Sequence, residues 1–424
     1  MIMIVTRDAI LGNSVFPYEL SIEDLCTRID NAQIALTTIT EVEAALIVSV
    51  EDHSPTSLEV ALVSSHIEDA LRPLDIALET IIGTNSISVE SVGSAIKAVY
   101  DFIADMIRKL VSFISSMFSS SSSSTSNFKS STKAVEEKTK KVEELVADKV
   151  AEPLTSIPLT DKRLMLPDGT MFTLASINSI TKAMRTEVDS WLDYIVTLDE
   201  SVGKISKLLA NNDSKKAIFR GVMDVRDSLD GGPDTPAIEL KIKGTEYVGI
   251  EVMGGKFLAL ALNSQSMKAL DDIGAKGDAI TDFNIATFIK HLFKVAKPAY
   301  INNPKLKEAK VGTYEVISPN NPTNDTKGIM AASVKLRDIY DDVVEVNDLT
   351  KSTLAKYEKE FKTFMKEGPS TDKETKAIRE AAMTAMLQAI TMSVTLTGYI
   401  MKITDNTSTA LVGLSDDILS KVKS

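Results

Sequence analysis

The stretch EGPST, residues 367–371, decides the fold class because it joins two long segments of helical character by a short turn. We expect one helix over about 326–366 before the glycine-proline pair. The serine or threonine after that pair is a suitable N-cap for a second helix, which we expect to run to about 404. A last short helix is expected over about 408–422. Long antiparallel helices joined by short turns are typical of a bundle.

A small β region is predicted upstream of these helices. Three short segments, about 237–243, 245–253 and 255–262, are separated by glycine-containing turns, which predicts an antiparallel meander. The third segment contains FLALAL at 257–262, which is apolar on both faces and must therefore be covered by other elements. The remaining elements that we expect are helices at about 20–49, 56–82, 91–118, 131–150, 175–210, 214–229 and 281–297, a hairpin at Leu166-Pro167-Asp168-Gly169, and a strand near 311–317.

The composition agrees with a mainly helical protein. The chain is 44% hydrophobic and 25% charged but only 5% aromatic, and its single cysteine, Cys26, rules out an intrachain disulfide. We predict a mainly α fold, a long-helix bundle with a small antiparallel β-meander insertion, preceded by an acidic helical propeptide. The expected domains are an acidic leader (1–90), an amphipathic helix with a serine-rich linker (91–128), a helical region with a small hairpin (129–235), a β-meander with a mixed insertion (236–325) and a C-terminal helical segment (326–424).

Charge is distributed unevenly along the chain. Residues 1–90 contain 15 acidic and 3 basic side chains, a net charge of −12, and the first lysine is Lys97. The whole chain also has a net charge of −12, so residues 91–424 are neutral overall. Such an asymmetry predicts that the first segment has a role of its own, although an acidic, solvated surface would give the same composition.

The segment 91–118 is predicted to be a strongly amphipathic helix. It is followed by six serines, Ser119–Ser124, which are typical of a flexible linker. The helix either lies on a membrane surface or a partner protein, or packs as a half-buried core helix of this chain. The residues of its apolar face are Ile96, Val99, Ile103, Met106, Leu110, Phe113, Ile114 and Met117.

The sequence contains no pattern that predicts catalysis. Its three histidines have no metal-ligand spacing relative to acidic residues, and the glycines at 254–255 are a turn between strands, unlike a phosphate-binding loop. No run of about 18 uncharged apolar residues predicts a standard membrane span. We therefore expect a non-enzymatic protein without catalytic, cofactor-binding or metal-binding residues.

A short pattern, a small residue followed by any residue and then glutamate, recurs in the acidic segment. One copy, Ser88-Val89-Glu90, coincides with the charge boundary, so Ser88, Val89, Glu90 and Ser91 are the candidate cleavage site. The other copies in this segment are Ser21-Ile22-Glu23, Ser49-Val50-Glu51, Ser57-Leu58-Glu59 and Ala77-Leu78-Glu79.

These features together resemble the internal head proteins of large tailed phages of the T4-like and jumbo kind. The resemblance rests on the acidic helical leader, the junction at 88–93, the amphipathic helix with its serine-rich continuation, and the hairpin at 166–169 that leads into long helices. It covers about residues 20–210, and the repeated glutamate pattern leaves the cut position open between several sites.

The resemblance implies a virion structural protein that is made in the host cytoplasm and enters the prohead with scaffold and capsid proteins. A prohead protease would remove the leader, and the mature part would stay in the capsid interior beside DNA and enter the host on ejection. The neutral charge of residues 91–424 argues against strong DNA binding, since no excess of basic residues is present. The sequence does not indicate an oligomeric state.

Two other functions fit the same sequence. A helical membrane-active protein, similar to the α-helical pore-forming toxins, would use residues 237–262 as an apolar β-tongue and the amphipathic helix for contact with a membrane surface. A virion structural protein outside the head, in the tail or baseplate, is the other. For the β region, the competing expectation is a small sheet packed on the bundle, because an exposed apolar strand promotes aggregation.

Overall fold

The computed structural model divides the chain into two compact units, Met1–Ile114 and Ser115–Ser424. Each unit is described separately below. The residues that the structure describes are 57–76, 121–148, 152–166, 169–173, 176–210, 215–230, 232–234, 238–276, 281–303, 312–366 and 373–422, together with isolated positions between 28 and 42 and between 92 and 112.

The described part of the first unit is helical. Helix α2, Ser57–Leu71, ends in a short 3-10 turn, Arg72–Leu74, because Pro73 has no amide hydrogen with which to continue the α-helical ladder. Every described residue between 28 and 42 and between 92 and 112 is also helical. The helices predicted over 20–49 and 91–118 are therefore confirmed at the positions that the structure describes. The helix predicted over 56–82 is shorter than expected, because its α-helix ends at Leu71 and the described residues Asp75 and Ile76 are not helical.

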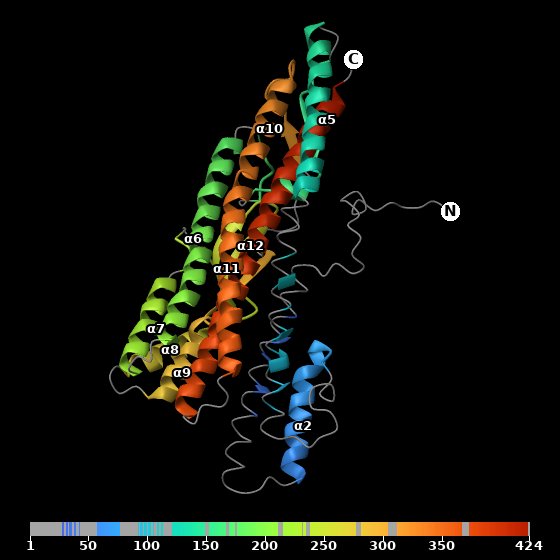
Figure 1. Ribbon diagram of the computed structural model, residues 1–424. Coiled ribbons are helices and arrows are strands. Elements are labelled where there is room, and N and C mark those ends of the chain that lie inside the picture. The colour runs from blue at the N-terminus through green and yellow to red at the C-terminus, as the bar shows by residue number, and fades with distance from the viewer. Residues whose placement is uncertain are drawn as a thin grey trace. The chain divides into compact units, whose positions relative to one another are not determined.

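Long helices form the frame of the second unit. Helix α6 spans Ile177–Ala210, α10 spans Thr323–Arg337, α11 spans Ile339–Lys366 and α12 spans Lys373–Lys421. They run side by side, with α12 in contact with the other three (Figure 1). The predicted mainly α fold with a small antiparallel sheet is confirmed.

Helix α12 corrects the prediction of two helices with a break near 404–408. The polar run in that region stays helical because its groups find partners: Thr404 donates to the carbonyl of Ile400, and the carbonyl of Ser408 accepts from the Ser333 hydroxyl of α10 at 2.9 Å. The single helix predicted over 326–366 is instead α10 and α11, which are separated only by Asp338 in a helical conformation.

Helix α5, Ser121–Ala147, begins earlier than predicted and includes most of the serine run that we expected to be a flexible linker. Its second half packs on the end of α12, where Val135 and Val142 are buried with Val412 and Leu419. Lys138 also pairs with an aspartate of α12. Serine costs a helix only about half a kcal/mol relative to alanine, so a helix docked at its C-terminal end can continue through serines.

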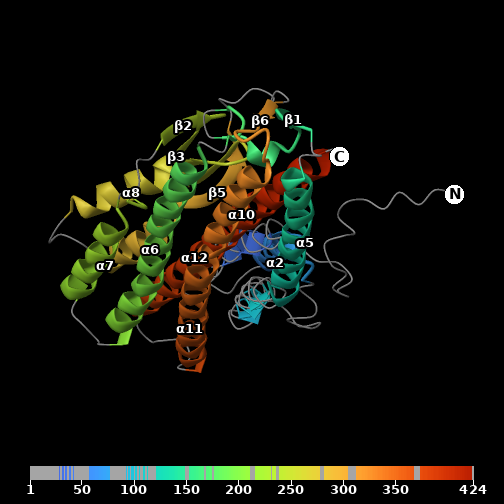
Figure 2. The ribbon, with the colours of Figure 1, turned by 90° about the horizontal axis from the view of Figure 1, so that it is seen from above.

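A four-stranded antiparallel sheet lies on one side of the long helices (Figure 2). Its strand order is β2-β3-β4-β5. The strands are β2 (Ile238–Ile242), β3 (Thr245–Val252), β4 (Lys256–Leu262) and β5 (Ala296–Asn302). The first three confirm the predicted meander, and helix α8, Ser264–Gly274, follows them.

Strand β5 corrects the helix predicted over 281–297. Helix α9 spans only Asp282–Leu292, and it begins at a capping box formed by Thr281 and Asn284. The chain then pairs along the whole of β4, from Ala296 opposite Leu262 to Asn302 opposite Lys256. This pairing satisfies the β4 edge, so the apolar strand is covered on both sides in the plane of the sheet.

The sheet packs on the bundle as a core element. In β4, Phe257, Leu258, Ala259 and Leu260 are all buried, so both faces of the strand are covered. On the helix side, Tyr300 of β5 contacts Tyr399 of α12 with ring centroids 5.7 Å apart. The expectation of a small packed sheet is therefore met, in place of an exposed tongue.

Gly249 allows β3 and β4 to approach closely. A Cβ atom at this position would lie 2.1 Å from the carbonyl oxygen of Leu258, which is well inside van der Waals contact. Because the obstructing atom belongs to the backbone, no side-chain rotation could relieve the overlap.

A second, smaller sheet pairs β1, Ser156–Leu159, with β6, Gly312–Glu315. The predicted strand near 311–317 is confirmed, whereas β1 was not predicted because Pro158 lies within it and Pro153 shortly before it. The predicted hairpin at 166–169 is present as a bridge between Met165 and Met171. Helix α7, Lys215–Leu229, completes the second unit and confirms the helix predicted over 214–229.

Candidate functional site

Most of the sequence-predicted site residues lie outside the described part of the chain. This applies to the candidate cleavage site Ser88, Val89, Glu90 and Ser91, and on the apolar face to Ile96, Ile103, Met106, Leu110, Phe113 and Met117. Val99 is described: it is helical and fully buried, whereas Lys97 and Asp101 on the polar face are exposed. The amphipathic pattern is therefore present at the positions that can be compared.

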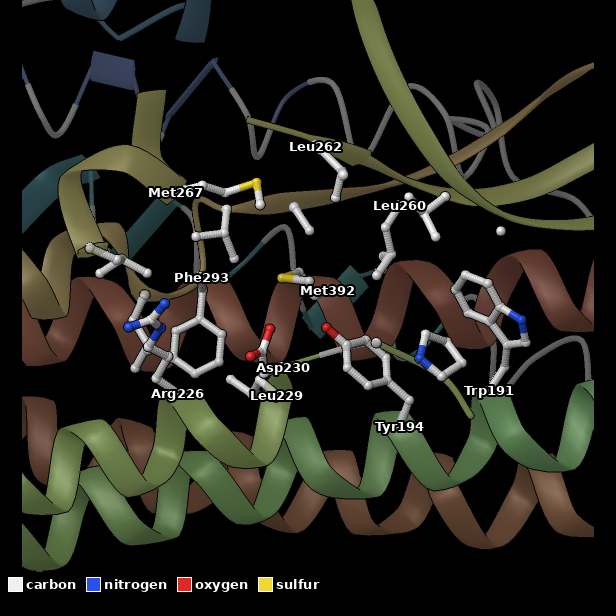
Figure 3. Close-up of a pocket in the computed structure, with 18 of the residues that line it drawn as sticks. Trp191, Tyr194, Arg226, Leu229, Asp230, Leu260, Leu262, Met267, Phe293 and Met392 are labelled. Atoms are coloured by element: carbon white, nitrogen blue, oxygen red, sulfur yellow. The ribbon is translucent and has the colours of Figure 1, made fainter. Parts of the chain in front are cut away.

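A cavity of about 310 Å³ lies in the second unit between the sheet and the helices. Strand β4 contributes Leu260 and Leu262 on one side, and α6 contributes Trp191 and Tyr194 on the other, with Met392 of α12 between them (Figure 3). The cavity exists because the sheet meets α6 and α12 through large side chains, which leave space between the layers.

The polar groups of the cavity come from one side of it. Tyr194 is 7% exposed, and its hydroxyl has no hydrogen-bond partner among the described residues. Burial raises the pKa of Tyr194, so the hydroxyl stays protonated at neutral pH. Figure 3 shows this hydroxyl and the carboxylate of Asp230 directed toward the same space, opposite Leu260 and Leu262.

An ion pair stands at the end of the cavity near α8. The Arg226 guanidinium of α7 donates to the Asp271 carboxylate of α8 at 2.6 Å. Asp230, at the end of α7, is exposed and has no ion-pair partner among the described residues. The three charged groups at the cavity therefore sum to one negative charge, which is carried by Asp230.

No histidine or cysteine is among the residues that line the cavity. His291 is held elsewhere by a 3.0 Å hydrogen bond with the Ser266 hydroxyl, and burial lowers its pKa. Among the described residues, no group of three or more histidine, cysteine, aspartate or glutamate side chains could hold a metal ion. The cavity is thus an apolar pocket with a few convergent polar groups, the usual form of a small-molecule site.

Sequence reasoning did not find this cavity. Its residues come from positions between Trp191 and Met392, on helices and strands that only the tertiary structure brings together. The one local signal was the apolar character of both faces of β4, which indicated a covered strand but not a space beside it.

A second polar feature lies inside the bundle, where α6, α11 and α12 meet. Asp199 of α6 is 3% exposed and accepts a 2.6 Å hydrogen bond from the Thr350 hydroxyl of α11. Its other carboxylate oxygen and the hydroxyl of Ser393 in α12 are buried without a hydrogen bond. Burial raises the pKa of Asp199 to about 6, against the opposing effects of the Thr350 and Ser393 hydroxyls and of the Lys356 charge.

Helix α12 is unusually apolar for its length. Its segment Ala377–Lys421 is, by length and composition, the one described stretch that could cross a membrane, because an 18-residue window within it has a mean hydropathy of 1.2. In the folded protein, 94% of that apolar window is buried. Its hydroxyl-bearing side chains are largely satisfied within the helix; the Thr391 hydroxyl, for example, donates to the Leu387 carbonyl at 2.8 Å.

Comparison of the chain with protein-family models, with curated proteins and with solved structures found no match.

Proposed function

We propose that this chain is a non-enzymatic virion structural protein, an internal head protein of a tailed phage, whose acidic leader is removed by proteolysis at Glu90. The observation that carries the proposal is the charge boundary: residues 1–90 have a net charge of −12 and residues 91–424 have none. The mature part is then a neutral body that stays in the capsid interior with the packaged genome.

A cut at Glu90 would divide the first unit, Met1–Ile114, and would leave the second unit whole. The long helices, both sheets and the buried contacts between them all belong to the second unit, Ser115–Ser424. The proposed cut at Glu90 lies 25 residues before that unit begins. Cleavage there would therefore leave the frame of the bundle intact and would retain the amphipathic segment 91–118 at the new N-terminus.

Electrostatics gives the leader a reason to be removed. Packaged DNA is a dense array of phosphate charges, and a segment with a net charge of −12 would be repelled by it. A neutral body can share the capsid with DNA but does not neutralise phosphates. Binding of DNA by the mature part should accordingly be weak and nonspecific.

The N-terminus of the protein in mature particles tests the proposal. Mass spectrometry of purified virions should find a chain that begins at Ser91, with peptides from 1–90 strongly depleted. Glu90→Gln should abolish processing at this position, and Glu79→Gln, in another copy of the same pattern, should leave it unchanged. An intact leader in mature particles, or absence of the protein from them, would contradict the proposal.

A second candidate, a membrane-active protein, is favoured by the apolar segment Ala377–Lys421 of α12. In that function α12 would leave the bundle and enter a bilayer. Dye release from phospholipid vesicles on addition of the purified chain would support this function and argue against the structural one. The burial of the segment in the folded protein instead agrees with its place as the central helix of the bundle.

A further inference from the structure

We propose that the cavity between β4, α6 and α12 is a binding site for a small amphipathic amine, with its alkyl part between Leu260 and Met392 and its ammonium group at Tyr194 and Asp230. This inference stands apart from the proposed virion function, since all residues that line the cavity belong to the second unit.

The size of the cavity sets the size of the ligand. A volume of about 310 Å³ lies at the lower end of ordinary small-molecule sites, which span about 300 to 1,000 Å³. The side chains of Leu260, Leu262 and Met267 form the apolar side (Figure 3). An unbranched alkyl chain of about eight carbons with one polar group fits this space, and its burial is favourable by about 25 cal/mol per Å² of apolar surface.

The Tyr194 hydroxyl indicates where the polar end of the ligand lies. The Tyr194 side chain is 93% buried, since 7% of it is exposed, and its hydroxyl faces the cavity without a hydrogen bond to the described residues. A hydroxyl that faces a largely apolar cavity can gain a hydrogen bond from a ligand that brings a polar group to it. An amine nitrogen can donate to the phenol oxygen, and it thereby supplies the missing partner.

The charges at the cavity select a cation. Arg226 is neutralised by Asp271 at 2.6 Å, which leaves the Asp230 carboxylate as the uncompensated charge beside the Tyr194 hydroxyl. A carboxylate only accepts hydrogen bonds, so it binds an ammonium group and repels an anionic head. The site should therefore prefer an amine over an alcohol of the same length, and an alcohol over a carboxylate.

Three probes of equal length test this order: octylamine, 1-octanol and octanoate, each added to the full chain. Trp191, the only tryptophan of the chain, lines the cavity and reports occupancy through its fluorescence. We expect a saturable change with octylamine, and dissociation constants about ten-fold higher for 1-octanol and higher still for octanoate. Octanol or octanoate binding as tightly as octylamine would overturn the assignment of an amine.

Matched variants locate the binding. Asp230→Asn should weaken octylamine binding about ten-fold without changing that of 1-octanol, and Tyr194→Phe should weaken both. Asp227→Asn removes an exposed carboxylate from the same helix, outside the cavity, and should change neither. Leu260→Trp should fill the space and abolish binding. Because Asp230 is on the surface, its variant decides the question even if the filled variant does not fold.

Two results would overturn the proposal. The first is the absence of any saturable Trp191 response to octylamine in the wild-type chain at millimolar concentration. The second is equal affinity of the wild type, Asp230→Asn and Tyr194→Phe, which would show that octylamine binds elsewhere on the protein.

Discussion

Two buried aspartates of the second unit differ in the number of hydrogen bonds that their carboxylates accept. Asp325, in the first turn of α10, is fully buried and accepts three hydrogen bonds, from the Tyr314 hydroxyl at 2.9 Å and from the amides of Ile317 and Ser318 at 2.8 and 3.1 Å. Asp199, in the middle of α6, is almost equally buried, yet it accepts one hydrogen bond, from the Thr350 hydroxyl at 2.6 Å.

The difference follows from the local backbone. The chain turns as it enters α10, which leaves free amides that a carboxylate can bind, and the helix N-terminus attracts negative charge. Inside the bundle, all amides of α6, α11 and α12 are used within their own helices, so only side chains can serve Asp199. The Asp325 carboxylate is therefore expected to stabilise the fold, and the Asp199 carboxylate to destabilise it.

The largest change in the free energy of unfolding is expected on replacing Asp325, whose carboxylate accepts three hydrogen bonds. Asp325→Ala should lower the free energy of unfolding by about 4 kcal/mol, because two amides and the Tyr314 hydroxyl lose their acceptor while buried. Urea unfolding followed by Trp191 fluorescence measures this. The control is Asp341→Ala, which removes an exposed first-turn acid of α11 and should cost less than 1 kcal/mol. Equal effects of the two variants would refute the anchoring role.

Replacement of the second carboxylate, Asp199, should instead stabilise the protein. The folded-state pKa of Asp199 is about 6, above the ordinary value of 3.8, so the wild type loses stability as the pH rises from about 4 to about 6. Asp199→Asn removes this loss of stability, because the amide does not ionise, and its oxygen can still accept the hydrogen bond from Thr350. Its free energy of unfolding should exceed that of the wild type by about 2 to 3 kcal/mol at pH 7.5.

The pH dependence separates this explanation from a general gain in packing. At pH 4 both forms carry a neutral group at position 199, and the difference between them should shrink toward zero. Unfolding in urea at pH 4.0, 5.0, 6.0 and 7.5 should thus show a gap that opens with pH and is constant above about 6.5. A gap that is the same at every pH would contradict the charge of Asp199 as its cause.

The smallest effect is expected for one of the three partners of Asp325. Tyr314→Phe should lower the free energy of unfolding by about 1 to 2 kcal/mol, because the two amide donors remain. Burial and the charge of Asp325 raise the pKa of Tyr314, so the hydroxyl is a donor at every pH used. A double-mutant cycle with Asp325→Ala should give a coupling of about 1 kcal/mol, and additive effects would show that the contact contributes nothing.

Local signals predicted several elements to within about two residues. Helices α6 and α7 were expected over 175–210 and 214–229 and span Ile177–Ala210 and Lys215–Leu229. The meander was likewise predicted, because glycine turns and short apolar segments are local features. The unbroken α12 was missed, since the polar run near 404–408 is stabilised by α10, a neighbour about 70 residues away in sequence.

The sequence alone determined the charge boundary at Glu90, the mainly helical character and the bounds of α6 and α7, because charge sums and helical periodicity depend only on neighbouring residues. It did not predict α8 or the way the C-terminal helices divide. Only the tertiary structure decided the pairing of β1 with β6 and of β4 with β5, the cavity at Tyr194 and the burial of Asp199. Each of these depends on residues that are distant in sequence and meet when the helices pack, and that packing, rather than any local pattern, determines which polar groups are left without water.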